Sequence, residues 1–385
     1  MRPSLDQMLS ELISAPSMSS VSPAFDTGNR LVSERLAGWL EDLGFEVKLQ
    51  AVEGKDKFNV IATLGRGNGG LVLSGHTDTV PYDEDRWNTD PFQLTEKDGR
   101  LYGLGTCDMK AFLGIAIEAA SRYRSEDLAE PIIILGTADE ESSMAGGKAL
   151  VAEHSLRARC AIIGEPTRLR PVHLHKGIYM EGVRLKGRSG HSSDPSLGNN
   201  ALDGMHRVLG ELLAFRDQMS RDHHNAAFHV PNPTLNLGHI HGGDNPNRIC
   251  PEAEVHYDLR TLPEQDMDAT RQTLQGRVRE VLKDSGLEIE FLPLFDGVGG
   301  LDTPEEAAIV QAVTELTGRE PEAVAFSTEG PFLQELGIDT VIIGPGDIAQ
   351  AHQPDEFLDT HTIQPTLDLV DGLIQRFCVK KDTPA

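Results

Sequence analysis

Short continuous apolar runs, separated by helical patterns, limit the fold of this chain more than any other feature of its sequence. The clearest runs lie at residues 71–74, 131–136, 160–164 and 340–344. Runs of this length without alternation are typical of strands that are covered on both faces. Helical spacing of apolar residues recurs between and around them, in the segments 4–15, 29–43, 109–121, 145–152, 303–317 and 366–377. Strands that alternate with helices predict an α/β domain with a mostly parallel sheet.

The middle of the chain has a different pattern, which predicts a second domain inserted into the first. Its elements follow the order strand, helix, strand, strand, helix, strand, at residues 179–186, 200–219, 234–240, 252–260, 264–285 and 287–292. This is the split, ferredoxin-like α+β arrangement. We therefore assign residues 1–177 and 295–385 to one domain and residues 178–294 to the inserted domain.

Composition excludes several classes of partner. The 385 residues include 60 acidic and 35 basic side chains, a net charge of −25, which argues against binding to nucleic acid or to an anionic membrane. No apolar run approaches the ~18 residues of a membrane span, and the N-terminal segment carries acidic residues within its apolar spacing. The four cysteines are scattered and form no CxxC pair, as is typical of reduced thiols. We expect a cytoplasmic protein.

Polar residues follow each of the apolar strands, at the edge where an open α/β sheet binds its ligands. His76 and Asp78 follow the strand at 71–74, and further acids and a histidine follow the other strands or precede a helix: Asp108, Glu140, Glu141, Glu165 and His352. Each carboxylate alone is commonplace as a helix cap or as a solvated side chain. Together, two histidines and several carboxylates suit two divalent ions such as zinc or cobalt. Such a site ionises water and polarises a carbonyl.

Other motifs carry weaker signals. Gly103-Leu-Gly105 lacks the third glycine and the preceding strand of a dinucleotide site, and no GxxxxGK[ST] motif occurs. Ser189-Gly-His191 suggests a serine–histidine pair, but no oriented acidic partner is evident. Spacing alone leaves open which of Glu140 and Glu141 is a metal ligand and which is a base.

Seven segments support a family resemblance that covers essentially the whole chain. In chain order they are SGHTDTVP, GLGTCDMK, ADEESSMAG, IIGEPT, SGHSSDP, NLGHIHGGDNPNRIC and GPGDIAQAHQPDE. Together they resemble the acetylornithine deacetylases, a branch of a di-metal superfamily that includes succinyl-diaminopimelate desuccinylases, aminoacylases and related carboxypeptidases.

The resemblance implies specific roles at the strand ends. The metal ligands would be His76, Asp108, Glu141, Glu165 and His352, with Asp108 bridging both ions. Glu140 would be the general base, which takes a proton from water and returns it to the departing amine. Asp78 would accept a hydrogen bond from His76 and fix its tautomer. A cis peptide bond is expected after Asp108.

The resemblance also implies roles for the inserted domain, which in these relatives forms a dimer interface and a lid. His191 would stabilise the oxyanion in the partner subunit's site. Asn247 and Arg260 would hold the substrate carboxylate, and Lys176 and Thr328 would line the pocket. From sequence alone, a surface ion pair is an equally good explanation of Arg260.

The implied reaction is hydrolysis of N2-acetyl-L-ornithine to acetate and L-ornithine, in arginine biosynthesis. Proline at 331, where the desuccinylases tend to have arginine, favours a short, uncharged acyl group. The alternatives are a related N-acyl-amino-acid deacylase, a desuccinylase or a dipeptidase with the same ions. A non-catalytic relative that binds a metabolite should have lost the base or a ligand, and this chain retains all of them.

Overall fold

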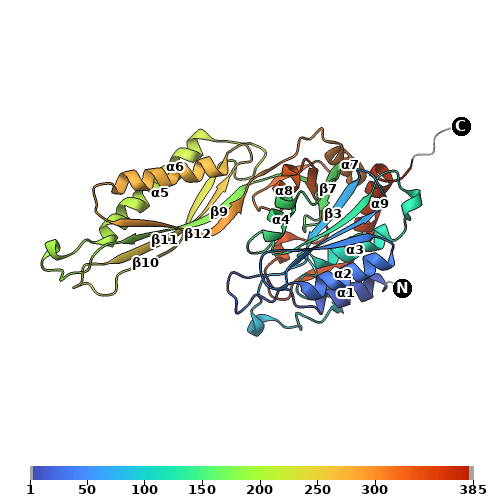
Figure 1. Cartoon of the computed structure of the whole chain (residues 1–385), viewed down its shortest axis with the longest axis horizontal. Coiled ribbons are helices and arrows are strands. Elements are labelled where there is room, and N and C mark those ends of the chain that lie inside the picture. The colour runs from blue at the N-terminus through green and yellow to red at the C-terminus, as the bar shows by residue number, and fades with distance from the viewer. Residues whose placement is uncertain (1–2, 381–385) are drawn as a thin grey trace. The chain divides into compact units, whose positions relative to one another are not determined.

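A nine-stranded sheet is the largest sheet of the computed structural model, which describes residues 3–380. Its strands follow the order β1-β2-β6-β3-β7-β15-β8-β13, with β14 beside β8. Two of its inner strands, β3 and β7, are labelled in Figure 1. Their bounds are β1 (Glu46–Ala51), β2 (Phe58–Leu64), β3 (Leu71–His76), β6 (Ile132–Thr137), β7 (Cys160–Ile163), β8 (Val172–His175), β13 (Leu301–Asp302), β14 (Glu322–Val324) and β15 (Asp339–Ile342). The four central strands β6, β3, β7 and β15 are parallel, which confirms the predicted α/β class. Strands β1 and β2 pair antiparallel, because the segment between them is too short for a crossover.

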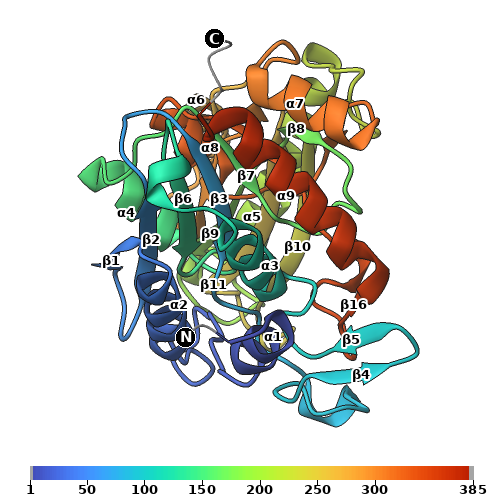
Figure 2. The same ribbon diagram turned by 90° about the vertical axis from the view of Figure 1, so that its right-hand side faces the viewer.

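Helices cover this sheet. They are α1 (Leu5–Ile13), α2 (Arg30–Asp42), α3 (Lys110–Ala120), α4 (Ala145–Glu153), α7 (Ala308–Thr317), α8 (Gly330–Glu335) and α9 (Ile363–Phe377). Helix α3 packs on β3 and contacts both α1 and α9 (Figure 2). Almost all of α3 is buried, because other elements surround it. This packing holds the N-terminal end of α3 close to the carboxyl end of β3.

A small three-stranded sheet was not predicted. It consists of β4 (Thr95–Lys97), β5 (Arg100–Tyr102) and β16 (Phe357–Asp359), in the order β16-β5-β4. Strands of three residues are too short for their apolar alternation to be recognised. The sheet matters for the site because β5 and β16 flank the segments that carry Asp108 and His352.

By its internal contacts the chain divides into two compact units. The first comprises residues up to His173, Thr303–Glu322 and the residues from Glu329 onward, and the second comprises Leu174–Asp302 and Ala323–Thr328. The second unit therefore begins and ends a few residues outside the predicted insertion of 178–294. The reason is that Leu301 pairs with His175, which adds the connecting strands to the second unit.

The second unit contains an antiparallel sheet with two helices on one face. Its elements are β9 (Gly177–Lys186), α5 (Ala201–Asp222), β10 (Thr234–Gly242), β11 (Glu252–Thr261), α6 (Met267–Leu282) and β12 (Glu288–Val298). The strand order is β10-β11-β9-β12, and the element order agrees with the predicted β-α-β-β-α-β arrangement. Apolar side chains of the helices and of β9 to β11 form its core.

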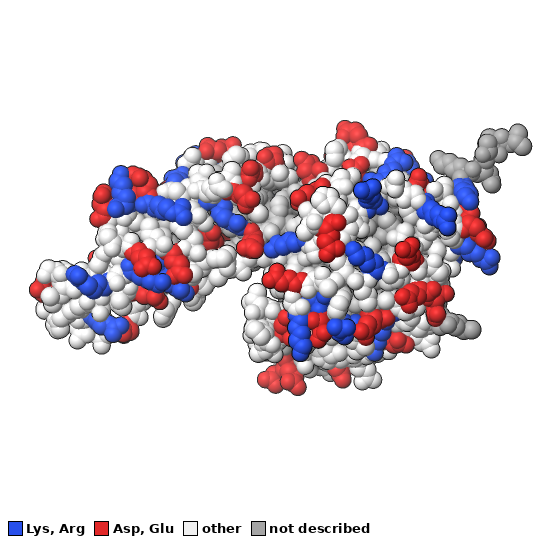
Figure 3. All heavy atoms as spheres, viewed as in Figure 1, with Lys and Arg blue, Asp and Glu red and all other residues white. Residues whose placement is uncertain are grey.

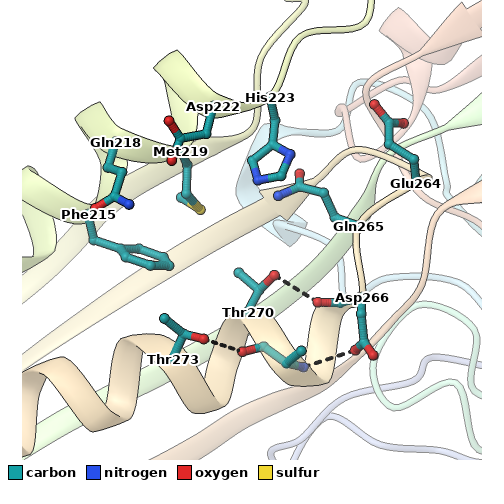
Figure 4. Close-up of a pocket in the computed structure, with 11 residues that line it drawn as sticks. Phe215, Gln218, Met219, Asp222, His223, Glu264, Gln265, Asp266, Thr270 and Thr273 are labelled. Carbon is teal, nitrogen blue, oxygen red and sulfur yellow. Dashed lines mark hydrogen bonds between the residues drawn. The ribbon is translucent and has the colours of Figure 1, made fainter.

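Helix α6 begins at Met267, three residues later than predicted. The reason is an N-terminal cap at Asp266. Figure 4 shows this residue in a pocket between the C-terminal end of α5 and the N-terminal end of α6. The Asp266 side chain accepts a hydrogen bond from the backbone N–H of Ala269 at 2.9 Å and so caps the helix. The pocket, of about 350 Å³, contains none of the predicted site residues.

The surface carries charges of both signs. Lys and Arg side chains lie interspersed with Asp and Glu side chains on the face drawn in Figure 3. Within residues 3–380, no helix combines the length and the apolar character needed to cross a membrane.

Candidate metal centre

The parallel strands bring the predicted ligands to one edge of the central sheet. Leu71 of β3 pairs with Ile132 of β6 and with Cys160 of β7, so these strands run in step toward the same edge. His76 is the last residue of β3, and Glu165 follows β7 after a single glycine. The sequence expectation that these side chains meet is therefore supported by the strand register.

A close helix–strand contact explains the glycine before Glu165. A Cβ atom on Gly164 would lie 2.0 Å from the ring of Phe112 in α3, so a larger residue would displace the helix. Because Asp108 lies just before α3, this contact also determines how near Asp108 comes to Glu165. The peptide bond between Asp108 and Met109 is cis, as the resemblance predicts.

Asp108 lies between the two predicted histidine ligands. Its Oδ1 is 3.0 Å from His76 Nε2, and its Oδ2 is 3.6 Å from His352 Nε2. Glu165 Oε1 lies 3.8 Å from His76 Nε2, and Glu141 Oε2 lies 3.0 Å from His352 Nε2. All five predicted ligands thus come together, and a carboxylate with one oxygen toward each histidine has the geometry that a bridging ligand needs.

Two groups of side chains that share His76 are each compact enough to hold a metal ion. Ligand atoms of His76, Glu140 and Glu165 lie within 4.8 Å of one another, and so do those of His76, Asp108 and Glu141. The predicted base, Glu140, is therefore also close enough to be a ligand.

The charges of this cluster fit bound cations. Among the described residues, the ion-pair partners of Asp108, Glu141 and Glu165 are His76 and His352. Burial raises the pKa of Glu140 well above its usual value, and Glu165 and Glu141 act in the same direction. Burial and then the charge of Asp108 likewise raise the pKa of Glu165. Buried carboxylates so close together are costly unless cations neutralise them, so this donor set fits divalent metal ions.

The structure corrects the expected contact between His76 and Asp78. Nδ1 of His76 lies 2.9 Å from the backbone oxygen of Asp78, whereas the carboxylate of Asp78 is 3.8 Å away. Because a carbonyl oxygen only accepts hydrogen bonds, Nδ1 carries the proton and Nε2 is left as a metal donor. The Asp78 carboxylate instead accepts the backbone N–H groups of Glu140, at 3.2 Å, and Glu141, at 3.1 Å.

Asp139, the residue before Glu140, makes a second set of contacts that sequence reasoning missed. Asp139 has a left-handed backbone with φ of 64°, an uncommon conformation for a residue with a side chain. Its buried carboxylate contacts Lys57 Nζ at 2.5 Å and accepts the Ser143 hydroxyl at 2.7 Å. The only signal in the sequence is a third acid beside the Glu pair, which does not reveal its distant lysine partner.

Comparison with known proteins identifies the family. A model of peptidase family M20/M25/M40 matches residues 72–376, which is most of the chain. The chain belongs to peptidase family M20/M25/M40.

Curated relatives agree with the predicted branch of the M20 family. The chain is 48% identical to an acetylornithine deacetylase of Pasteurella multocida (strain Pm70), over 98% of both chains. It is 46% identical to an acetylornithine deacetylase of Edwardsiella ictaluri (strain 93-146), again over 98% of both chains. The resemblance stated from the sequence motifs is thus confirmed.

Solved M20 structures share the fold. An M20 metallo-carboxypeptidase from Sulfolobus solfataricus has a TM-score of 0.77 and 18% identity, with 97% of this chain and 99% of that chain covered. A Bacillus subtilis protein described as a dinuclear metal binding peptidase of the M20 family has a TM-score of 0.67 and 16% identity, with 96% of each chain covered.

The remaining predicted site residues of this M20 chain lie in its second unit, in two groups. His191 and Asn247 belong to adjacent loops, since the Ser192 N–H donates to the Asn247 oxygen at 3.0 Å. His191 is exposed, and its Nδ1 accepts the Ser193 N–H at 3.2 Å.

The other group is Lys176, Arg260 and Thr328, whose N–H donates at 3.3 Å to Nε2 of His175, the residue before Lys176. Lys176 is buried, and its Nζ donates to the Asn232 backbone oxygen at 2.6 Å. Burial lowers the pKa of Lys176, and the charge of nearby Arg260 acts in the same direction. Arg260 itself pairs with Asp258 at 3.1 Å, so the ion pair that sequence left open does occur.

Proposed function

We propose that this chain removes the acetyl group from N2-acetyl-L-ornithine, giving acetate and L-ornithine in arginine biosynthesis. The observation that carries the proposal is the position of Asp108 between His76 and His352, with Glu140, Glu141 and Glu165 around them. The choice of substrate is supported by full-length relatives at 45–48% identity that are named acetylornithine deacetylase.

Two divalent metal ions, zinc or cobalt, would occupy the centre. His76 and Glu165 would bind one ion, Glu141 and His352 the other, and Asp108 both. When bound, such ions acidify water and polarise the amide carbonyl.

The chain's own residues carry out the proton transfers. Glu140 accepts a proton from the attacking water and delivers it to the amide nitrogen as the bond to carbon breaks. The backbone of Glu140 is held through its N–H by the Asp78 carboxylate, which limits how far the base moves between the two transfers.

His191 stabilises the negative charge that develops on the carbonyl oxygen. Because the Ser193 N–H donates to Nδ1, a neutral His191 carries its proton on Nε2, where it serves as a hydrogen-bond donor. Arg260 and Asn247 bind the substrate carboxylate, and Lys176 and Thr328 contribute to substrate binding.

The second unit also forms a homodimer and acts as a lid. Strand β10 is an edge strand of its sheet, and unpaired edges pair readily with a second copy. Three exposed apolar side chains also favour a dimer interface at this edge: Leu202 and Leu213 on α5, which packs on β10, and Ile240 on β10 itself.

The cytoplasmic location stays a prediction.

The deciding experiment measures amine release from three substrates in parallel. Metal-stripped protein is assayed with N2-acetyl-L-ornithine, N-succinyl-diaminopimelate and a dipeptide, before and after addition of zinc or cobalt. Metal-dependent cleavage of the acetyl substrate alone is the expected result. Cleavage of only one of the other two would assign the chain to a neighbouring deacylase or dipeptidase, and metal binding without any cleavage would support a non-catalytic relative.

A further inference from the structure

We infer that Asp355 and Glu356 are positioning residues that set the separation of Asp108 and His352. The inference rests on the proposed function, because the two residues that are held apart are proposed metal ligands. Neither carboxylate faces the metal centre in the manner of a ligand; both bind backbone N–H groups of neighbouring loops instead.

Glu356 binds the loop that ends in Asp108. Its side chain is buried, and its Oε1 accepts the N–H groups of Cys107 at 2.6 Å and Asp108 at 3.0 Å. Oε2 accepts the N–H of Gly105 at 3.0 Å. Three backbone donors on one buried carboxylate replace much of the hydration that its charge would have in water.

The backbone around Glu356 also binds the segment that precedes Asp108. Its carbonyl oxygen accepts the N–H of Gly103 at 3.1 Å, and the next residue, Phe357, pairs with Tyr102 in the small sheet. The segment just after His352 is therefore bound along its length to the segment just before Asp108. His352 precedes Glu356 by only four residues, so a shift of Glu356 would move both proposed ligands relative to each other.

Asp355 connects the same segment to a third loop. Its carboxylate accepts the N–H of Asn88 at 2.8 Å, the Asn88 side-chain amide at 2.5 Å and the N–H of Thr89 at 3.2 Å. Both His352 and Asp355 have a left-handed backbone, with φ of 60° and 56°. This conformation is uncommon for residues with side chains, so the loop needs such contacts to keep its shape.

The carboxylates of Glu356 and Asp355 should therefore affect the binding of the two metal ions differently. Asp108 has one oxygen toward each histidine, so loosening its loop through Glu356 disturbs both metal sites. Loosening the His352 loop through Asp355 disturbs only the ion that His352 binds. General destabilisation of the fold would not distinguish the two binding steps.

The test is a Co²⁺ titration of metal-free full-length protein, followed by the visible absorption of the bound ion. Glu356→Gln keeps the size of the side chain but turns one acceptor into a donor that faces an N–H. We expect it to weaken both binding steps by about 10- to 100-fold and to alter the absorption spectrum. Asp355→Asn should weaken one step only. Glu96→Gln, on the exposed side of β4, is the matched control and should bind as the wild type does.

Hydrogen exchange gives a readout without metal. In the metal-free protein, the N–H groups of Gly105, Cys107 and Asp108 should exchange faster in Glu356→Gln than in the wild type. Wild-type affinity, spectrum and exchange in both variants would overturn the inference. A wild-type chain that binds no Co²⁺ would overturn the proposed function and the inference with it. If Glu356→Gln does not fold, equal weakening of both steps in Asp355→Asn is the result that contradicts the proposal.

Discussion

The carboxylate of Asp78 holds Glu141 by its backbone: the N–H of Glu141 donates to Asp78 Oδ2 at 3.1 Å, while Oδ1 accepts the neighbouring N–H of Glu140. The acid beside the first histidine thus orients the segment that carries the proposed base. Its backbone oxygen, rather than its side chain, receives the proton of His76 Nδ1. One residue at the end of β3 therefore orders two parts of the proposed centre.

Replacing Asp78 with Asn should disturb both stability and turnover. The amide group would present a donor to one of the two N–H groups and leave it unpaired in a buried place. We expect the free energy of unfolding to fall by about 1–3 kcal/mol, and kcat to fall by roughly 10- to 100-fold. Urea unfolding and steady-state kinetics measure the two effects. The exposed Asp85→Asn is the control, and an unchanged kcat in Asp78→Asn would contradict the orienting role.

Replacing Glu140 with Gln distinguishes a base from a ligand. Without a carboxylate to accept the proton of water, turnover should fall by at least about 100-fold while two ions remain bound. Metal content by mass spectrometry, measured together with amine release, tests this. Loss of one ion along with activity would instead make Glu140 a ligand, which its distance to His76 and Glu165 also permits.

His191→Ala should slow turnover without loss of metal, by about 100-fold or more if the side chain stabilises the oxyanion. Hybrid dimers decide in which subunit it acts. One chain carries Glu140→Gln and the other His191→Ala, and the hybrids are purified through two different tags. If His191 serves the partner's site, each hybrid keeps one complete site and about half of the wild-type activity. Hybrids as inactive as either parent would place His191 in its own chain's site.

The stability of the protein should depend on His175 at mildly acidic pH. Burial lowers the pKa of His175 to about 4, and its neutral Nε2 accepts the N–H of Thr328 at 3.3 Å. Because the folded pKa lies below the unfolded value of ~6.5, the unfolded state binds the proton first as pH falls, so stability is lost between about pH 6.5 and 4.

The expected size of this loss is roughly 2 kcal/mol between pH 6.5 and pH 5, at about 1.4 kcal/mol for each pH unit. Urea unfolding at pH 7 and pH 5 measures it for the wild type, His175→Gln and the exposed control His224→Gln. The wild type and the control should lose about 2 kcal/mol more than His175→Gln does. Equal losses in all three would show that His175 does not stay neutral in the fold.

Local sequence patterns were sufficient to predict the buried strands of the large sheet. The apolar runs at β3, β6 and β7 are covered on both faces, so their composition alone indicates buried parallel strands. Parallel strands end at one edge, which brought His76, Glu141 and Glu165 together in the prediction. The motifs around them were sufficient to predict the family.

Only the tertiary structure decided which atoms meet across long stretches of chain. Glu356 and Cys107 are 249 positions apart, and Asp139 and Lys57 are 82 apart, yet each pair forms a buried contact. The proton of His76 goes to a backbone oxygen that every residue type possesses, so no side chain could have indicated it. Periodicity and motifs record what a residue does within its own strand or helix. Hydrogen bonds between loops depend on where the whole fold brings those loops, and that position has no local signal in the sequence.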